Sequence, residues 1–337
     1  MKGISLRHEG DLGRYPELER IKGLAIALVV WGHLASATFF TFPMWFLVSI
    51  SVVYSFHMPL FMYVSGFVFF HSRYHERFWK SPTQYIIGRV DRLIIPFVLI
   101  GLIITCGKFA LGSLGGIPDP VESLAVGIWE IVANSPGNPA ASVWYLIVLF
   151  SYTVITPILI RICRDKIAYI LAFSATFWIL EATDFLYIDR ILHYYIFFIL
   201  GGLVARNYES VKLHLHNWTA ASCVIFFMSC WFFHRGQYAI LICGLCSIPA
   251  IHGLFLSRIF DKERILLALG GQTMIIYLTN TIIIGILNIL FYRIFDRSSH
   301  VVLLTFFMFF CATYIPILFK KTLERFHFFA PFHKYIS

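Results

Sequence analysis

Residues 19–33, ERIKGLAIALVVWGH, place charged side chains at the start of an apolar helix and a single histidine within the apolar run. Residues 23–32 carry no charge, so we expect a helix that enters lipid from its charged end. His33 then lies three turns above Lys22, about 16 Å along the helix axis. An ionisable side chain at such depth is costly in a membrane and normally faces a cavity or a partner.

The rest of the chain has the same apolar character. Of its 337 residues, 59% are hydrophobic and 13% are charged, whereas a soluble domain has about 25% charged residues. Ten apolar runs are long enough, or nearly so, to cross a hydrocarbon core that needs about 20 helical residues. They cover residues 23–40, 44–70, 93–110, 142–160, 167–183, 191–205, 217–233, 238–256, 265–292 and 300–319. Because lipid offers no partner to an open sheet edge, we predict an all-α, polytopic membrane helix bundle of about ten transmembrane helices.

The basic residues predict how this bundle is oriented. Ten spans put both termini on one side, and the segments on that side carry 22 of the 27 Lys and Arg residues, against 5 on the other. Cytoplasmic segments carry such an excess, so both termini are predicted to be cytoplasmic. The net charge of +9 then follows from the inner segments. No nucleic-acid partner is expected, because no basic patch is interleaved with aromatic residues.

We predict a single membrane domain over residues 1–337. It has a cytoplasmic N-terminal segment at 1–20, an extracytoplasmic loop at 110–141 and a cytoplasmic tail at 320–337. Glycines and prolines in the long loop favour a structured loop with a short interfacial helix, which would cover a site. The first 20 residues are polar and no cleavage pattern follows the first run, so that run is predicted to be an anchor.

Two histidines are expected at similar depth on adjacent helices. Eleven steps of about 100° return nearly to the starting direction, so Glu19, Lys22 and His33 share one helix face. The second run returns inward and places His57 about 21 Å above its inner end, close to the depth of His33. The two imidazoles would share one cavity, or each would simply hydrogen-bond a neighbouring carbonyl. No further Asp, Glu or Cys lies near them in sequence at that depth, so no metal site is predicted.

A basic inner segment follows the second run and contains Arg73, Arg77, Arg89 and Arg92. Arg89 and Arg92 are spaced i,i+3 and so share a helix face. Guanidinium groups suit phosphate, which favours a phosphate-rich cytoplasmic ligand. The general excess of basic residues in inner loops would explain the same positions without a ligand.

Aromatic and polar residues gather in three further stretches: VWYLIVLF at 143–150, HYYIFFILG at 193–201 and GGQTMIIYLTN at 270–280. Trp and Tyr near span ends commonly anchor a helix at the interface, but sugar sites also use aromatic platforms. Acidic residues of 181–189 would bind an acceptor hydroxyl or a cation. The candidate substrate-binding residues are Ser65, Trp144, Tyr145, Asp184, His193, Tyr277 and Asn280.

These stretches resemble the membrane acyltransferase-3 family, most closely its sugar O-acetylase branch, the fucose 4-O-acetylase-like proteins. FHMPLFMYVSGF at 56–67 is similar to the family's FHMPLFFFISGY-type signature. Arg89, Arg92 and Pro96 match its RxxR followed by proline, and WYL at 144–146 resembles its WFL segment. GGQTMIIYLTN resembles a pattern of glycine, a small polar residue and then IYLLH.

The resemblance also includes departures from the usual residues. The family opens with an acidic residue, a basic residue three positions on, and a histidine on the first span, here Glu19, Lys22 and His33. Asp and Arg are more common at the first two positions, and lysine lacks the bidentate fork of arginine. Asn280 stands where a histidine is common, so no catalytic role is transferred to it.

The resemblance implies transfer of an acyl group, usually acetyl, from cytoplasmic acetyl-CoA to a hydroxyl of a cell-envelope polysaccharide or lipid-linked sugar. The protein would lie in the bacterial inner membrane, among its lipids. Donor phosphates would meet Lys22, Arg89 and Arg92, with Arg73 and Arg77 nearby.

Roles for the remaining motif residues follow from the same resemblance. His33 would be the general base, with an acyl-histidine as the less favoured variant. His57 would orient His33 or stabilise the oxyanion, and Glu19 would orient Lys22 through an i,i+3 ion pair. The alternative is a proton-coupled transporter or glycan exporter, which would also use buried histidines. No inverted repeat is seen, and the ordered motifs favour transfer.

Overall fold

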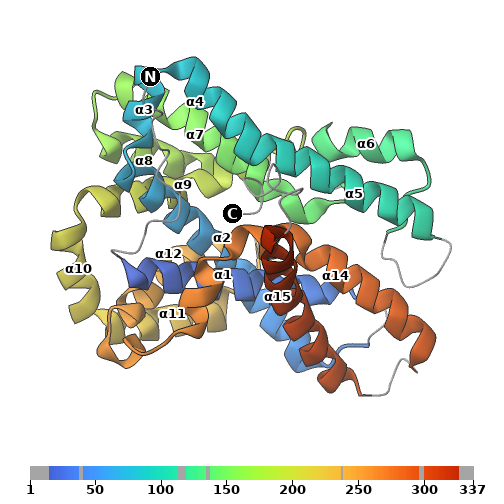
Figure 1. The fold of residues 1–337 in the computed structure, drawn as a ribbon. Coiled ribbons are helices and arrows are strands. Elements are labelled where there is room, and N and C mark those ends of the chain that lie inside the picture. Colours follow the sequence, from blue (N-terminus) through green and yellow to red (C-terminus); the bar gives the residue numbers. More distant parts are fainter. Residues whose placement is uncertain are drawn as a thin grey trace.

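The computed structural model describes residues 15–37, 41–112, 119–133, 137–236, 238–295 and 300–325. Within these ranges all extended regular structure is helical, and no strand element is present. The predicted all-α class is therefore confirmed. Figure 1 shows helices that cross one another at varied angles, with α2 passing through the middle of the assembly.

Each of the ten apolar runs coincides with a helix. These helices are α1 (Pro16–His33), α2 (Met44–His71), α5 (Ile95–Leu111), α7 (Trp144–Ile162), α8 (Ile167–Thr176), α9 (Ile188–Arg206), α11 (Thr219–Phe233), α12 (Ala239–Phe255), α14 (Thr273–Ile294) and α15 (Val301–Arg325). The shorter helices are α3 (Tyr74–Lys80), α4 (Pro82–Arg89), α6 (Leu124–Ala133), α10 (Tyr208–Asn217) and α13 (Ile265–Gly270). Single helical turns lie at Leu34–Ser36, Val90–Ile94, Ala141–Val143, Phe177–Ile179 and Arg258–Phe260.

In the part of the chain that the structure describes, six helical segments are long and apolar enough to span a membrane. They are Met44–His71, Pro82–Leu111, Ala141–Ile162, Ile188–Arg206, Thr273–Ile294 and Val301–Arg325. Helices α8, α11 and α12 are apolar but shorter, and α1 begins with several charged residues. The chain is a multi-pass membrane protein; ten spans and cytoplasmic termini remain predictions.

Two helix boundaries differ from the sequence prediction. The first apolar run, 23–40, ends earlier than expected: α1 covers Pro16–His33, so the charged turn is helical, as the shared helix face requires, and His33 is its last residue. Proline at the first helical position supports that start. The run 265–292 is divided into α13 and α14 at Gly270 and Gly271, because glycine weakens a continuous helix.

The predicted outer loop at 110–141 contains one helix, α6, which packs on α5 (Figure 1). The contact uses small residues: a Cβ at Gly101 would lie 3.0 Å from Ile131, and one at Gly127 would lie 2.8 Å from Thr105. A short helix in this loop is thus confirmed.

Helix α2 is the central element, apolar on all faces and in contact with α1, α7, α9 and α12. Its closest partner is α9, where two glycines allow backbone to meet backbone. A Cβ at Gly66 would collide with the carbonyl oxygen of Phe198, and one at Gly201 with that of Tyr63. Close approach through small residues is a usual way to join helices in lipid.

A second glycine pair joins α1 to the α13–α14 junction. A Cβ at Gly23 would collide with the carbonyl oxygen of Leu266, and one at Gly270 with that of Glu19. Arg20 adds a polar contact, donating from its guanidinium to the carbonyl oxygens of Asp261 at 3.2 Å and Glu263 at 3.4 Å. These contacts hold the charged turn of α1 against α13 and the segment before it.

A buried polar chain fastens the same end of α1 to three other helices. The Tyr208 hydroxyl donates to the Glu17 carboxylate, and the Tyr63 hydroxyl lies 2.6 Å from Nδ1 of His252. The Tyr208 hydroxyl also lies 3.5 Å from Nε2 of His252. Burial and the hydrogen bond to Glu17 raise the pKa of Tyr208, so its phenol keeps its proton.

Candidate active site

Two cavities lie one after the other along the same helices. The cation-lined cavity, defined by Lys22, Arg89 and Arg92, has a volume of about 340 Å³. The histidine-lined cavity, defined by His33, His57 and His193, has a volume of about 690 Å³.

The order of residues along each helix shows that the cavities differ in depth. On α1, Lys22 lines the cation-lined cavity and His33 the histidine-lined one. Helix α2 runs the opposite way, and places His57 in the histidine-lined cavity and Ser65 in the cation-lined one. The two cavities therefore lie at successive depths along α1 and α2.

Lys22 enters the cation-lined cavity from the first turns of α1. Its Nζ lies 3.2 Å from Oε1 of Glu19, and both side chains are largely buried. The predicted i,i+3 ion pair is thus present. The second carboxylate oxygen of Glu19 is buried without a hydrogen bond in the described structure. The pair holds the ammonium group at the cavity wall rather than in open solvent.

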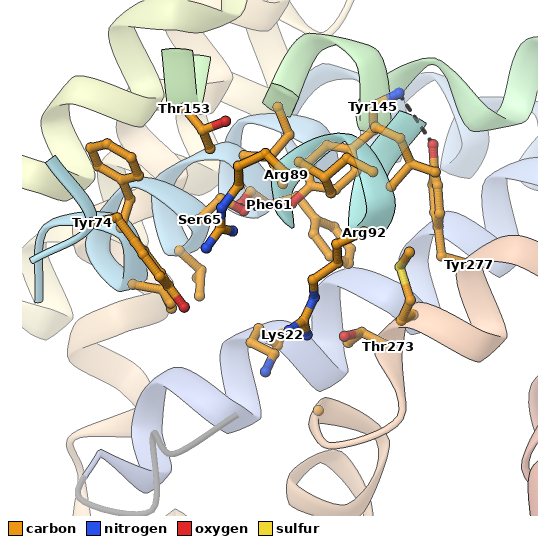
Figure 2. Close-up of a pocket in the computed structure, with 18 of the residues that line it drawn as sticks. Lys22, Phe61, Ser65, Tyr74, Arg89, Arg92, Tyr145, Thr153, Thr273 and Tyr277 are labelled. Carbon is orange, nitrogen blue, oxygen red and sulfur yellow. Dashed lines mark hydrogen bonds between the residues drawn. The ribbon is translucent and has the colours of Figure 1, made fainter. Parts of the chain in front are cut away.

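Arg89 and Arg92 come from the opposite wall, where α4 passes through a π-helical turn at Val90–Ile94 into α5. Single π-turns inside helices often occur at functional sites. The Arg89 guanidinium lies 4.1 Å from the ring centre of Tyr74, which also lines the cavity. Figure 2 shows Lys22, Arg89 and Arg92 around the same cavity, each on a different element. Such a cluster of cations suits an anion with several charges.

The remaining walls of the cation-lined cavity are mixed. Apolar side chains of α2 and α7, including Val64, Val68 and Leu149, line one part. Another part is lined by the junction of α13 and α14, with Gly270 and Gly271, and by Thr273 and Met274 in the first turn of α14. The N-terminus of a helix carries partial positive charge, which adds to that of the three basic side chains.

In the histidine-lined cavity, His57 has a defined tautomer when neutral. Its Nδ1 lies 2.7 Å from the carbonyl oxygen of Val53, so Nδ1 carries the proton and Nε2 the lone pair. The ring of His33 forms no hydrogen bond with the described residues, so its nitrogens remain available to a ligand. Next to it, the Tyr54 hydroxyl donates to the Gly32 carbonyl at 2.9 Å.

A third histidine of this cavity is paired with a carboxylate. Nδ1 of His193 lies 2.9 Å from Oδ1 of Asp189, one turn earlier on α9, and its ring packs 4.7 Å from that of Trp178. Asp189 and Trp178 also line the cavity. A carboxylate at Nδ1 leaves Nε2 as the group that faces a ligand.

Tyr277 separates the two cavities, because it lines both. Its hydroxyl donates to the carbonyl oxygen of Ser142 at 2.5 Å and accepts the Tyr145 backbone N–H at 3.2 Å, as Figure 2 shows for the latter. The Tyr145 hydroxyl in turn lies 2.5 Å from Oγ of Ser65. The two tyrosine rings are 5.6 Å apart and meet edge to face. Together they form a hydrogen-bonded partition between α2, α7 and α14.

A scan against protein-family models matches residues 15–320 to the model described as Acyltransferase domain, of the acyltransferase-3 family. The chain belongs to this family. The match covers both cavities and nearly all of the helices. No curated protein and no solved structure matches the chain. The protein is therefore an acyltransferase. The match does not assign it to a branch of the family.

The structure brings most of the predicted site residues of this acyltransferase into the two cavities. Lys22, Arg89, Arg92, Ser65 and Tyr145 line the cation-lined cavity. His33, His57, Trp144 and His193 line the histidine-lined cavity, and Tyr277 lines both.

Five predicted residues of the acyltransferase lie outside the cavity walls, and one of them, Glu19, is the ion-pair partner of Lys22. Arg73 is exposed and pairs with Glu76 at 2.6 Å, while Arg77 stacks over Tyr74 at 4.9 Å. Asp184 is exposed in the segment before α9. Asn280 is fully buried and donates to the carbonyl oxygens of Ile276 and Tyr277, at 2.9 and 2.8 Å. These positions give no support for direct ligand contact.

Other cavity residues of the acyltransferase are absent from the predicted set. Asp189 was predicted only as one of the acidic residues of 181–189 that would bind a hydroxyl or a cation, although its i,i+4 spacing to His193 is the signal that would have paired them. Arg190 and Trp178 carry no local sequence signal, since only the fold turns them toward α2 and α7. In the described structure, no group of three His, Cys, Asp or Glu side chains is arranged to hold a metal ion.

Proposed function

We propose that the protein is a membrane O-acetyltransferase. It moves an acetyl group from cytoplasmic acetyl-CoA to a hydroxyl of a cell-envelope polysaccharide or lipid-linked sugar, in the bacterial inner membrane with its N-terminus cytoplasmic. The observation that carries this proposal is the pair of stacked cavities, one lined by cations and one by histidines, with a single tyrosine between them. Donor and acceptor would enter from opposite sides and meet at this partition.

The cation-lined cavity suits the donor. The phosphates of acetyl-CoA would lie between Lys22, Arg89 and Arg92, where guanidinium groups can bind two phosphate oxygens at once. Arg73 and Arg77 would attract the donor from the adjacent surface. The thin pantetheine arm would pass along the apolar wall of α2 and α7. The rise from Lys22 to His33, about 16 Å, is within the reach of such an arm.

The histidine-lined cavity suits the acceptor and the chemistry. His33 takes the proton of the acceptor hydroxyl as its oxygen attacks the thioester carbonyl carbon. The tetrahedral intermediate collapses by breaking the carbon–sulfur bond, and His33 returns the proton to the leaving thiolate. The products are the acetyl ester and free CoA, so no other reactant is needed. The unbonded ring nitrogens of His33 support this role.

Neighbouring residues would assist the transfer. His57 holds a fixed tautomer through Val53 and would orient the reacting groups or, when protonated, stabilise the oxyanion. Aromatic rings of Trp144 and Trp178 offer flat apolar surfaces for a sugar ring. Tyr145 and Tyr277 would contact the thioester where it passes the partition.

The decisive experiment uses purified protein in liposomes with labelled acetyl-CoA and unacetylated envelope glycan. Wild-type protein should transfer label to the glycan, and His33→Ala should abolish transfer while it still binds the donor. Transfer at the wild-type rate by His33→Ala would exclude the base assignment. Solute flux without acetyl-CoA consumption would favour the transporter alternative, which the family membership already disfavours.

A further inference from the structure

Arg190 is a charged group in the histidine-lined cavity that the proposed transfer reaction does not use. It lies in the first turn of α9 and lines the cavity together with Trp144 and Tyr194. Its guanidinium forms no ion pair or hydrogen bond with any residue that the structure describes. Nη1 in particular is buried and has no hydrogen-bond partner there.

The acidic residues that line the same cavity do not neutralise Arg190. Asp189, its neighbour in sequence, is paired with His193 at 2.9 Å. Glu181 lines the cavity too, but its side chain is exposed to solvent and forms no ion pair in the described structure. One full positive charge thus remains at the wall, close to the paired His193.

Aromatic contacts keep this guanidinium in place without satisfying its N–H groups. Its central carbon lies 4.8 Å from the ring centre of Trp144 and 5.8 Å from that of Tyr187. Stacking of this kind orients the planar fork, yet its donors still need acceptors. A buried donor without a partner is costly, so such a group in a cavity wall is suited to a ligand that supplies oxygen atoms.

We propose that Arg190 binds an anionic group of the acceptor, so that the acetylated hydroxyl belongs to a sugar that carries a carboxylate or phosphate, or to its immediate neighbour. This inference rests on the proposed O-acetyl transfer, because it assigns the histidine-lined cavity to the acceptor. The guanidinium donates two N–H groups to two oxygen atoms of the anion, while His33 and His193 face the hydroxyl groups. Carboxylate and phosphate share this chemistry, and the experiment separates them.

The test uses unacetylated envelope glycan purified from cells that lack the protein. The glycan is offered to wild-type protein in three forms: native, with its carboxylates methyl-esterified, and after removal of its phosphate groups. One of the two treatments should lower kcat/KM by about tenfold or more, because a hydrogen-bonded charge is lost. That treatment identifies the source of the anion.

Matched variants assign the effect to Arg190. Arg190→Gln should lose the same factor on native glycan and become insensitive to the treatment, while Arg190→Lys should lose less. Arg235→Gln, at an exposed arginine that does not line the cavity, should match wild type. Binding of acetyl-CoA, measured by thermal shift, should persist in all variants and shows that they are folded.

Three results would overturn the inference while leaving the transfer reaction intact. These are equal rates on all three glycan forms, unchanged activity in Arg190→Gln, or an Arg190→Gln variant that still discriminates between the forms. If both Arg190 variants lose acetyl-CoA binding, Arg190 has a structural role in the fold. That result would also contradict the proposed contact between Arg190 and the acceptor. Absence of any label transfer by wild-type protein would instead overturn the proposed function.

Discussion

Lys22 is a lysine whose charge is held at a cavity wall rather than in solvent. Its side chain is 16% exposed and its ammonium group is fixed by Glu19 at 3.2 Å. Taking two charges out of water costs free energy that their attraction only partly offsets. The position is therefore better explained by a ligand that needs the charge than by stability.

Replacing Lys22 tests its role in donor binding. Lys22→Ala should raise the KM for acetyl-CoA by about tenfold or more, with a smaller effect on kcat, because a charge-assisted contact to phosphate is lost. Lys22→Arg should retain most of the affinity, since arginine keeps the charge and adds a fork. Steady-state kinetics in detergent would measure both. Lys80→Ala, at an exposed lysine of α3, is the control, and an equal effect there would refute a specific contact.

Asp189 determines which nitrogen of His193 faces the cavity. Asp189→Asn keeps the shape but weakens the hydrogen bond to Nδ1 and removes the charge. We expect kcat/KM for the acceptor to fall by about tenfold, while the KM for acetyl-CoA stays unchanged. A change in donor affinity of the same size would mean that Asp189 acts through the fold instead.

At the scale of helices, the α2–α9 contact depends on two glycines. An added methyl group at Gly66 or Gly201 would collide with a backbone carbonyl that no side-chain rotation can move. Gly66→Ala and Gly201→Ala should each cost about 1–3 kcal/mol and lower the Tm by several degrees. Gly285→Ala on α14 has open space around the added methyl and should leave the Tm unchanged or slightly raised. Equal Tm values for all three variants would contradict the close packing.

The sequence predicted which segments form helices better than it predicted where each helix begins and ends. The ten apolar runs each form a helix because a chain in lipid must bond its own backbone. The first run was expected to reach residue 40, but α1 ends at His33. Nor did the sequence indicate that Glu17, Glu19 and Arg20 are buried, as they are by α10, α13 and the segment before α13. Such burial depends on contacts with residues more than 190 positions away, which no local pattern reports.

The candidate site also has residues that could be predicted from the sequence and residues that could not. Residues on one helix face, such as Lys22 and His33, were predicted together because helix geometry alone relates them. Arg190 and Trp144 meet only through the packing of α9 on α7, so spacing could not pair them. The π-helical turn after Arg89 likewise has no simple sequence signature, although it directs Arg92 into the same cavity.

At the scale of the whole molecule, the partition at Tyr277 is the feature that transfer across the bundle requires. In the proposed reaction, a thioester exposed to water from the histidine-lined cavity would be open to hydrolysis, so the two substrates should meet at the partition while water is kept from the donor. Tyr277 lines both cavities, and its hydroxyl ties α14 to Tyr145 of α7 and to Ser142 in the turn before α7. We expect the ring of Tyr277, rather than its hydroxyl, to keep water away from the donor thioester.

Tyr277→Ala should therefore uncouple donor consumption from transfer. Hydrolysis of acetyl-CoA without acceptor should rise above the wild-type level, and acetyl transfer should fall by about tenfold or more as the thioester loses its position. Tyr277→Phe keeps the ring and should show wild-type hydrolysis. The rate at which free CoA is released in the absence of glycan measures this hydrolysis directly.

A control must separate a leak at the partition from general loosening of the bundle. Ile284→Ala removes a buried side chain from the same helix, away from both cavities, and should lower stability by about 2–5 kcal/mol without raising hydrolysis. Increased hydrolysis in Ile284→Ala as large as in Tyr277→Ala would assign the leak to instability. Hydrolysis confined to Tyr277→Ala would instead show that one side chain keeps the donor thioester from water until the acceptor is in place.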